Sequence, residues 1–100
     1  MYVLDLETLV WRRVEEKGVW PAARYFHSLD RWGEGKLVLW GGMGMAEDGT
    51  GCVLGDLWVF DVRTGLWMEL PGAGRARYAH LSAVVRDRLV IMGGQEITNE

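Results

Sequence analysis

The second half of this chain repeats the first half, with the same residue types in the same order. The recurring pairs are Asp5 and Asp61, Trp11 and Trp67, Arg24 and Arg77, Tyr25 and Tyr78, His27 and His80, Leu37-Val38 and Leu89-Val90, and Gly41-Gly42 and Gly93-Gly94. The separation drifts only from 56 residues (Asp5 to Asp61) to 52 (Gly41 to Gly93). A period of about 50 residues is typical of proteins built from stacked supersecondary units. The chain is therefore predicted to consist of repeated units.

Short apolar runs bounded by turn residues predict strands. The runs are residues 36–40, 56–61, 66–70 and 89–92. They are too short for helices and rich in β-forming residues, so we expect strands buried on both faces. Between two of them, Asp61 and Thr64 can hydrogen-bond the backbone of a turn, and Gly65 can take positive φ. No stretch keeps apolar residues at helical spacing beyond two turns, which favours an all-β fold.

Taken together, these motifs resemble the kelch repeat over nearly the whole chain. The likeness is carried by Gly18, Pro21, Arg24 and His27, by Gly41-Gly42, by the segment 56–61, and by Thr64, Gly65 and Trp67. The resemblance implies one four-stranded antiparallel blade per repeat. It therefore implies an all-β, kelch-type β-propeller fragment whose blades form an incomplete ring.

The likeness makes residues 1–100 one kelch-repeat segment. Residues 1–15 are expected to form the last two strands of one blade, 24–70 one full blade, and 77–94 the first two strands of the next. Leu9 stands where the second unit has Gly65, and a Leu at positive φ is strained. We therefore expect the first turn to be of another type.

The repeated residues have structural interpretations. The positions are Trp11, Arg24, His27, Gly41, Gly42, Asp61, Gly65, Trp67, Arg77, His80, Gly93 and Gly94. The glycine pairs are expected to permit positive φ or close backbone packing at strand ends. The Trp residues offer large surfaces for packing between blades. The Arg residues are expected to bond nearby backbone or an acidic group, although contact with a partner stays open.

Catalytic chemistry is hard to assemble from these residues. His27 and His80 invite a metal hypothesis, but no second Cys or recurrent carboxylate joins them, which favours structural histidines with satisfied ring nitrogens. Ser82 shares a strand face with His80, yet nothing supplies the third member of a catalytic set. We predict no enzyme, no metal and no cofactor. The resemblance leaves one alternative, a fragment of a kelch-type propeller enzyme acting on a sugar, as an oxidase or an epimerase.

The composition and net charge of the chain exclude several classes of partner and location. The net charge is −3, and no cluster of Lys and Arg offers a counterion-releasing surface, which argues against nucleic acid. Cys52 is the only cysteine, so no intrachain disulfide can form, and it is expected to fill space. No apolar run is long enough for a membrane span, and no signal peptide is recognisable. A cytoplasmic protein is therefore expected.

The residues that do not repeat are the candidates for function. Residues 43–55 are long for a hairpin connection, and loops of this length are usually functional or disordered. The resemblance places this loop on one face with residues 16–23 and 71–76. The candidate partner-binding residues there are Trp20, Met43, Met45, Glu47, Asp48 and Arg75. The predicted function is a protein-protein interaction module of a scaffold or adaptor, which holds a protein partner through its inter-strand loops.

Two blades' worth of strands cannot close a propeller, which has about 4–8 blades. The terminal half-blades would expose unpaired strand edges and apolar faces, and both favour association. We therefore expect further blades, from a longer chain or from other copies of this one.

Overall fold

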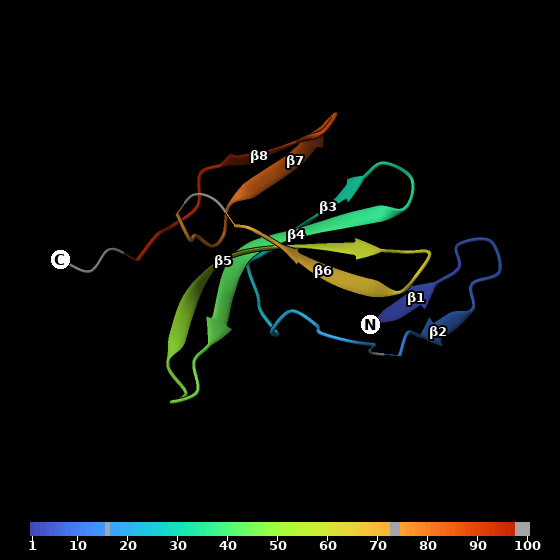
Figure 1. The fold of residues 1–100 in the computed structure, drawn as a ribbon, viewed down its shortest axis with the longest axis horizontal. Helices are drawn as coiled ribbons and strands as arrows, with labels where there is room; N and C mark the ends of the chain where they lie inside the picture. The colour runs from blue at the N-terminus through green and yellow to red at the C-terminus, as the bar shows by residue number, and fades with distance from the viewer. Residues whose placement is uncertain (16, 73–74, 98–100) are drawn as a thin grey trace.

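The computed structural model describes residues 1–15, 17–72 and 75–97, which are all-β (Figure 1). Eight strands form three antiparallel sheets, ordered β1-β2, β3-β4-β5-β6 and β7-β8. The strands are β1 (Tyr2–Leu4), β2 (Trp11–Arg13), β3 (Ser28–Trp32), β4 (Lys36–Met45), β5 (Gly51–Asp61), β6 (Leu66–Leu70), β7 (Leu81–Val85) and β8 (Arg88–Met92). These ranges contain no helix with the length and apolar character needed to cross a membrane. The all-β prediction is confirmed.

The core lies in the two middle strands of the four-stranded sheet. The buried apolar side chains of the described residues are Val38, Leu39 and Trp40 of β4 and Trp58, Val59 and Phe60 of β5. Neighbouring residues on a strand face opposite sides of the sheet. Both faces of this sheet are therefore covered, which explains why the sequence shows continuous apolar runs rather than alternation.

The two-stranded sheets match the two halves of the central sheet. The pair Leu4↔Trp11 of the first small sheet occupies the same repeat positions as Phe60↔Trp67. The pair Leu81↔Met92 of the last small sheet likewise corresponds to Ser28↔Trp40. Hence β1–β2 corresponds to the outer pair β5–β6, and β7–β8 corresponds to the inner pair β3–β4. The described strands thus form one whole blade with half a blade on either side of it in sequence.

Backbone groups join the central sheet to the following half-blade. The N–H of Gly42 donates to the carbonyl of Arg77 at 2.9 Å, and the N–H of Ala79 donates to the carbonyl of Phe26 at 2.9 Å. Figure 1 shows β7 lying beside β3 above the central sheet. These bonds satisfy donors that would otherwise be left unpaired where two sheets meet.

Side chains complete the same contact. The His80 ring packs edge-on against Trp40, with ring centroids 4.9 Å apart. The Ser82 hydroxyl donates to the Asp30 carboxylate. Farther along, the indole N–H of Trp32 donates to Asp87 at 3.0 Å. The two sheets are therefore held together along the length of β3.

The first turn is of the same type as the second, contrary to the expectation. Leu9 has φ of 59° and Gly65 has φ of 72°. In each turn an Asp carboxylate, of Asp5 or Asp61, accepts bonds from two backbone N–H groups, and a Thr hydroxyl accepts a third. A backbone bond closes each turn, so each turn has four local hydrogen bonds. These bonds fix the conformation of the turn and hold Leu9 at a positive φ that is strained for a leucine.

The predicted long loop over residues 43–55 is also wrong. Strand β4 continues to Met45 and β5 begins at Gly51, so only residues 46–50 connect them. Glycine and polar residues made this stretch resemble a loop. The two strands pair with each other beyond the core, so that backbone bonds replace apolar burial as the source of order.

Gly41 offers a direct test of the contact between the blades. An added Cβ would stand 2.8 Å from the Arg77 carbonyl oxygen and 3.0 Å from the His80 ring. We expect Gly41→Ala to lower the free energy of unfolding by about 3 kcal/mol, through positive-φ strain and steric overlap. Gly65→Ala is the control, because nothing lies within 4 Å of its Cβ position, and it should cost about 1 kcal/mol. Equal losses in urea unfolding would refute the packing described.

Candidate functional site

Beyond the core, β4 and β5 extend as a two-stranded arm, comprising residues 42–54. Strand β3 pairs with β4 only as far as Trp40, and β6 pairs with β5 only from Leu57 onward. The register shifts between Trp40 and Gly42, which is the position of a β-bulge. Bulges bend a strand and increase its twist. Figure 1 shows the arm turning away from the rest of the sheet.

The tip of the arm is ordered by its own side chains. The N–H of Ala46 donates to the carbonyl of Thr50 at 2.8 Å. One Asp48 oxygen accepts from the Thr50 hydroxyl at 2.6 Å and from its N–H at 3.0 Å. These hydrogen bonds, with the hydroxyl bond first, lower the pKa of the Asp48 carboxyl. Beside this charged turn, Met45 is 76% exposed.

An ion pair secures the base of the arm. The Arg24 guanidinium donates to both oxygens of Asp56, at 2.6 and 2.8 Å, and also to the Gly41 carbonyl at 3.2 Å. The Arg24 side chain is 3% exposed. Its bond to Asp56, aided by the indole N–H of Trp58 at 2.7 Å, outweighs desolvation and lowers the pKa of Asp56. Arg24 thus bonds both an acidic group and the backbone.

Arg77 in the next unit also bonds a glycine carbonyl and an acidic group, although its acidic partner lies at a different repeat position. Arg77 donates to the Gly93 carbonyl at 3.0 Å and to Glu96 at 2.7 Å. Tyr78 pairs with Gln95 as Tyr25 pairs with Met43. Residues 95–97 therefore correspond to the first residues of an arm, 43–45.

A groove of about 760 Å³ lies between the arm and these residues. It is lined by Gly51, Cys52 and Val53 from the arm, by Arg75 and Ala76, and by Glu96 and Ile97. The Arg75 side chain is 81% exposed, and among the described residues its one ion pair is with Glu96 at 3.6 Å. Glu96 already bonds Arg77 at 2.7 Å. Within the described residues, the groove therefore carries the exposed positive charge of Arg75 beside a Glu96 that is more closely paired with Arg77.

Five of the six predicted partner-binding residues lie on the arm or across this groove. Met43, Met45, Glu47 and Asp48 belong to the arm, and Arg75 lies on the opposite wall. Trp20 is elsewhere. It packs edge-on against Trp67 with ring centroids 6.2 Å apart, and Trp67 is paired with Phe60 near the other end of β5. The structure thus brings five of the six candidates together at the arm and its groove, and it places Trp20 elsewhere.

The repeated Trp and His residues have different surroundings in the two units. Trp67 is half-buried against Phe60, whereas Trp11 is 65% exposed. His80 is buried, and neither ring nitrogen has a hydrogen-bond partner among the described residues, so its nitrogens are not satisfied as predicted. Desolvation first, and then the charge of Arg77, lowers the pKa of His80. Its role in the described structure is packing as a neutral ring.

No metal centre was predicted. Within residues 1–15, 17–72 and 75–97, no three His, Cys, Asp or Glu side chains gather as a set of metal ligands. The arm and the groove together offer a recess, the exposed side chain of Met45, and charged groups that lie apart from one another, Asp48 on the arm and Arg75 across the groove.

A comparison with protein families assigns the chain. The KLHDC2/KLHL20/DRC7 Kelch-repeats domain matches it over residues 1–100. The chain belongs to the kelch-repeat family. The kelch resemblance predicted from the repeat is thereby confirmed, as is the propeller-fragment fold that it implies.

Named relatives of this kelch-repeat chain differ in kind. It is 36% identical to protein ral2 of Schizosaccharomyces pombe, over 99% of the chain and 21% of ral2. It is 30% identical to human tRNA wybutosine-synthesizing protein 4, over 93% of the chain and 13% of that protein. It is also 30% identical to human host cell factor 1, over 94% of the chain and 5% of that protein. The chain thus spans about a fifth or less of these relatives, and none of the three is named for action on a sugar.

The buried ion pair at the base of the arm predicts a large effect on stability. Asp56→Ala leaves the enclosed Arg24 guanidinium without its counter-charge, so the free energy of unfolding should fall by about 3–5 kcal/mol. Arg75→Ala removes an exposed arginine and should change it by no more than about 0.5 kcal/mol. Chemical denaturation of both variants measures the difference. Comparable small effects would mean that Arg24 is solvated rather than enclosed.

Proposed function

We propose that this kelch-repeat domain holds a protein partner on the face formed by the arm and the adjoining groove. The observation that carries the proposal is the exposed, ordered arm itself. Its tip is stabilised by Asp48 and its base by the Arg24–Asp56 pair, while Met45 stays open to solvent. Ordering a protruding strand pair costs conformational entropy, and a tip that buries no apolar surface gains little stability in return. Exposed, ordered segments of this kind often serve binding.

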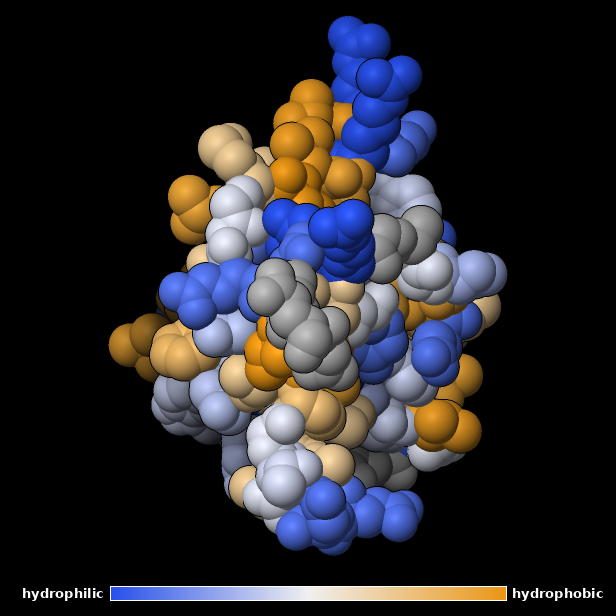
Figure 2. Space-filling model, turned by 90° about the vertical axis from the view of Figure 1, so that its left-hand side faces the viewer, coloured by the Kyte–Doolittle hydropathy of each residue, from blue (hydrophilic) through white to orange (hydrophobic). Residues whose placement is uncertain are grey.

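The chemistry of the face suits a protein surface. Met is flexible and adapts to irregular apolar surfaces, while charged residues set the orientation of a partner. Met45 and Glu47 supply these on the arm, and Arg75 supplies a positive charge across the groove. Figure 2 shows hydrophilic surface at the lower end of the molecule, where Figure 1 has the arm's tip, with apolar surface between charged patches above it. Interfaces often combine an apolar centre with a polar rim.

The proposal extends to the role of the domain as a non-catalytic module of a scaffold or adaptor. Its support is the kelch-repeat family assignment together with the exposed tip of the arm, residues 45–50, whose backbone hydrogen bonds stay within the arm. The cytoplasmic location stays a prediction, as does the part of Trp20 in partner binding.

Photo-cross-linking in cells tests whether the arm meets a partner. A photoreactive residue placed at Met45 should yield covalent adducts of defined higher mass. The same residue at Glu34, exposed in the turn between β3 and β4, is the control and should yield none above background. Equal adduct patterns at both positions would argue against a specific arm surface.

Substitutions then measure the contribution of each residue to affinity for the captured partner. Met45→Ala and Arg75→Ala should each weaken binding about five- to tenfold, because central interface residues cost more than 1 kcal/mol when truncated. Glu47→Ala is matched by Glu69→Ala, which removes an exposed Glu from β6. The affinity should fall for the first and stay unchanged for the second, as measured by titration calorimetry. Unchanged affinity for all arm variants would refute the proposed surface.

A further inference from the structure

One edge of the arm is open along strand β5. On β4, the Met43 N–H donates to the Tyr25 carbonyl at 2.8 Å, and the Met43 carbonyl accepts from the Tyr25 N–H at 2.9 Å. Both groups of Met43 therefore point away from Val53, its partner across the arm on β5. In an antiparallel pair, residues that exchange hydrogen bonds alternate with residues that do not. Val53 therefore directs its own N–H and carbonyl outward from the arm, and so does Gly51, two residues before it.

The outward backbone groups of Gly51 and Val53 are unpaired within the described part of the chain. Among residues 1–15, 17–72 and 75–97, no hydrogen bond reaches them from another strand or a loop. Strand β6 pairs with β5 only from Leu57 onward, and the Cα of Ala76 lies 3.1 Å from the position of an added Cβ at Gly55. The open edge is therefore confined to the outer part of the arm, residues 51–54.

The edge formed by β4 is different. Tyr25 already pairs with Met43, and the carbonyl of Ala23 lies 3.5 Å from the position of an added Cβ at Gly44. In Figure 1, β5 forms the outer, left-hand side of the arm, and β4 forms the side toward the segment that precedes β3. Open edges are commonly protected by charged residues or proline, but residues 51–53 are Gly-Cys-Val. The arm is thus suited to receive a further strand on its β5 side.

The groove beside the arm lies against this open edge. Its volume is about 760 Å³, and its wall on the arm consists of Gly51, Cys52 and Val53. Paired strands lie about 4.8 Å apart, so an extended chain in the groove would be close enough to β5 to form a ladder. The opposite wall includes Ile97, which is 58% exposed. Val53 and Ile97 therefore offer apolar contact to the side chains of such an extended chain.

The charge in the groove favours an acidic occupant. Arg75 is exposed, and its ion pair with Glu96 spans 3.6 Å, whereas Glu96 lies 2.7 Å from Arg77. A carboxylate brought into the groove can thus bond Arg75 while Glu96 keeps its shorter bond to Arg77. Hydrogen bonds between a guanidinium and a carboxylate are strong, and they fix orientation as well as affinity. Arg75 would therefore set the position of an added strand along the edge.

We propose that the groove holds an extended segment of the partner protein, which pairs as an added strand with Gly51 and Val53 of β5 and places an acidic side chain against Arg75. This inference rests on the proposed function, because it assigns the mode in which the partner is held. In such complexes the backbone bonds supply affinity, and the side-chain contacts supply specificity. The segment should therefore contain an Asp or Glu among β-forming residues, and no proline where it pairs.

Peptide selection supplies a probe for this mode. A phage-displayed library of random linear peptides is selected on the intact protein that carries this domain, and the enriched peptides are synthesised. N-methylation of each peptide amide in turn should abolish binding at every second residue of the paired segment and preserve it at the residues between. Only alternate residues of an added strand bond to the edge. Losses without this alternation would contradict strand pairing.

Val53→Pro locates the pairing on the arm. Proline has no N–H, and the fold tolerates it on an edge strand where that N–H points outward. The affinity for the selected peptide should fall about tenfold or more, while the circular dichroism spectrum stays that of the parent protein. Val53→Thr is the matched control, because it keeps the N–H and a β-branched side chain, and it should bind as the parent does. Equal affinities of the two variants would refute pairing at Val53.

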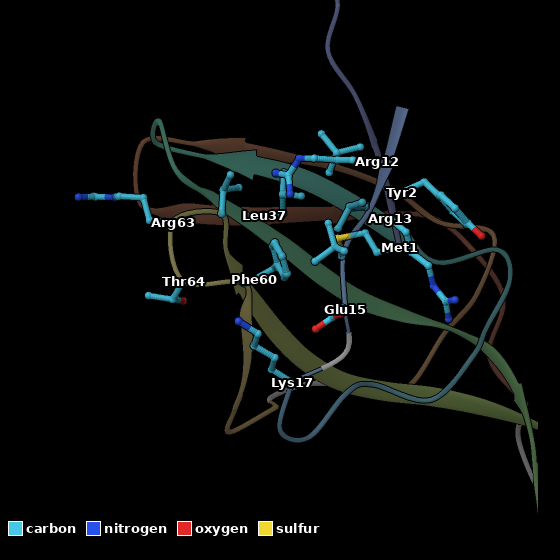
Figure 3. A pocket seen from close by; sticks show the side chains of 15 residues that line it. Met1, Tyr2, Arg12, Arg13, Glu15, Lys17, Leu37, Phe60, Arg63 and Thr64 are labelled. Carbon is cyan, nitrogen blue, oxygen red and sulfur yellow. The ribbon is translucent and has the colours of Figure 1, made fainter. Parts of the chain in front are cut away.

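A charge reversal tests the contact with Arg75. Arg75→Glu should weaken binding of the acidic peptide about tenfold, and replacing the peptide's acidic residue with Lys should restore it. Arg63→Glu is the control, since it makes the same charge change in the turn after β5, at the other end of that strand from the arm. Figure 3 shows the Arg63 side chain turned away from the recess beside β1–β2. Equal losses for the two variants would mean that net charge, rather than a contact with Arg75, attracts the peptide.

The inference and the proposed function fail separately. If Met45→Ala and Glu47→Ala weaken partner binding but Val53→Pro leaves it unchanged, the added strand is wrong and the arm surface stands. If Val53→Pro abolishes binding of the selected peptides while partner affinity is unchanged in all arm variants, the edge receives a strand and the proposed partner surface is wrong. Selection that enriches no peptide dependent on Val53 would overturn the inference.

Discussion

The contact between the central blade and the half-blade that follows it is the constraint on which the rest of the structure depends. At its centre, Gly41 and Gly42 bring two backbones so close that the Gly42 N–H reaches the Arg77 carbonyl, and the His80 ring covers the gap against Trp40. Any side chain at Gly41 would separate the sheets. Because Gly41 also lies at the bulge where the arm begins, the same residue sets how blades stack and where β4 and β5 leave the core.

Much of the fold could be predicted from the sequence because the repeat supplies two independent copies of each signal. The strand positions followed from apolar runs that end in paired glycines, and the kelch resemblance followed from their order. The turn at Leu9 could not be predicted from that residue, since side-chain bonds from Asp5 and Thr8 override its steric preference. The arm was missed because its strands contain Gly44, Gly51 and polar residues, and pairing rather than burial orders them.

The sequence likewise indicated one part of the candidate site and gave no signal for the other. The sequence singled out the candidate residues on the arm because they do not repeat, which set them apart from residues that serve the blades. The groove beside them had no signal in the sequence, because it depends on the placement of residues 95–97 as the start of a second arm. Trp20 resembled an exposed anchor in the sequence, yet it packs against Trp67 far along β5 from the arm. Spatial proximity of that kind is not encoded in any local pattern.

Amide hydrogen exchange at two residues tests the central contact most directly. The N–H groups of Gly42 and Ala79 each donate across the junction between blades, to Arg77 and Phe26. The account predicts that both exchange as slowly as the amides within β4 and β5, because opening them requires the blades to separate. Exchange as fast as that of Gly49, in the exposed turn of the arm, would contradict it. The two units would then be independent sheets rather than stacked blades.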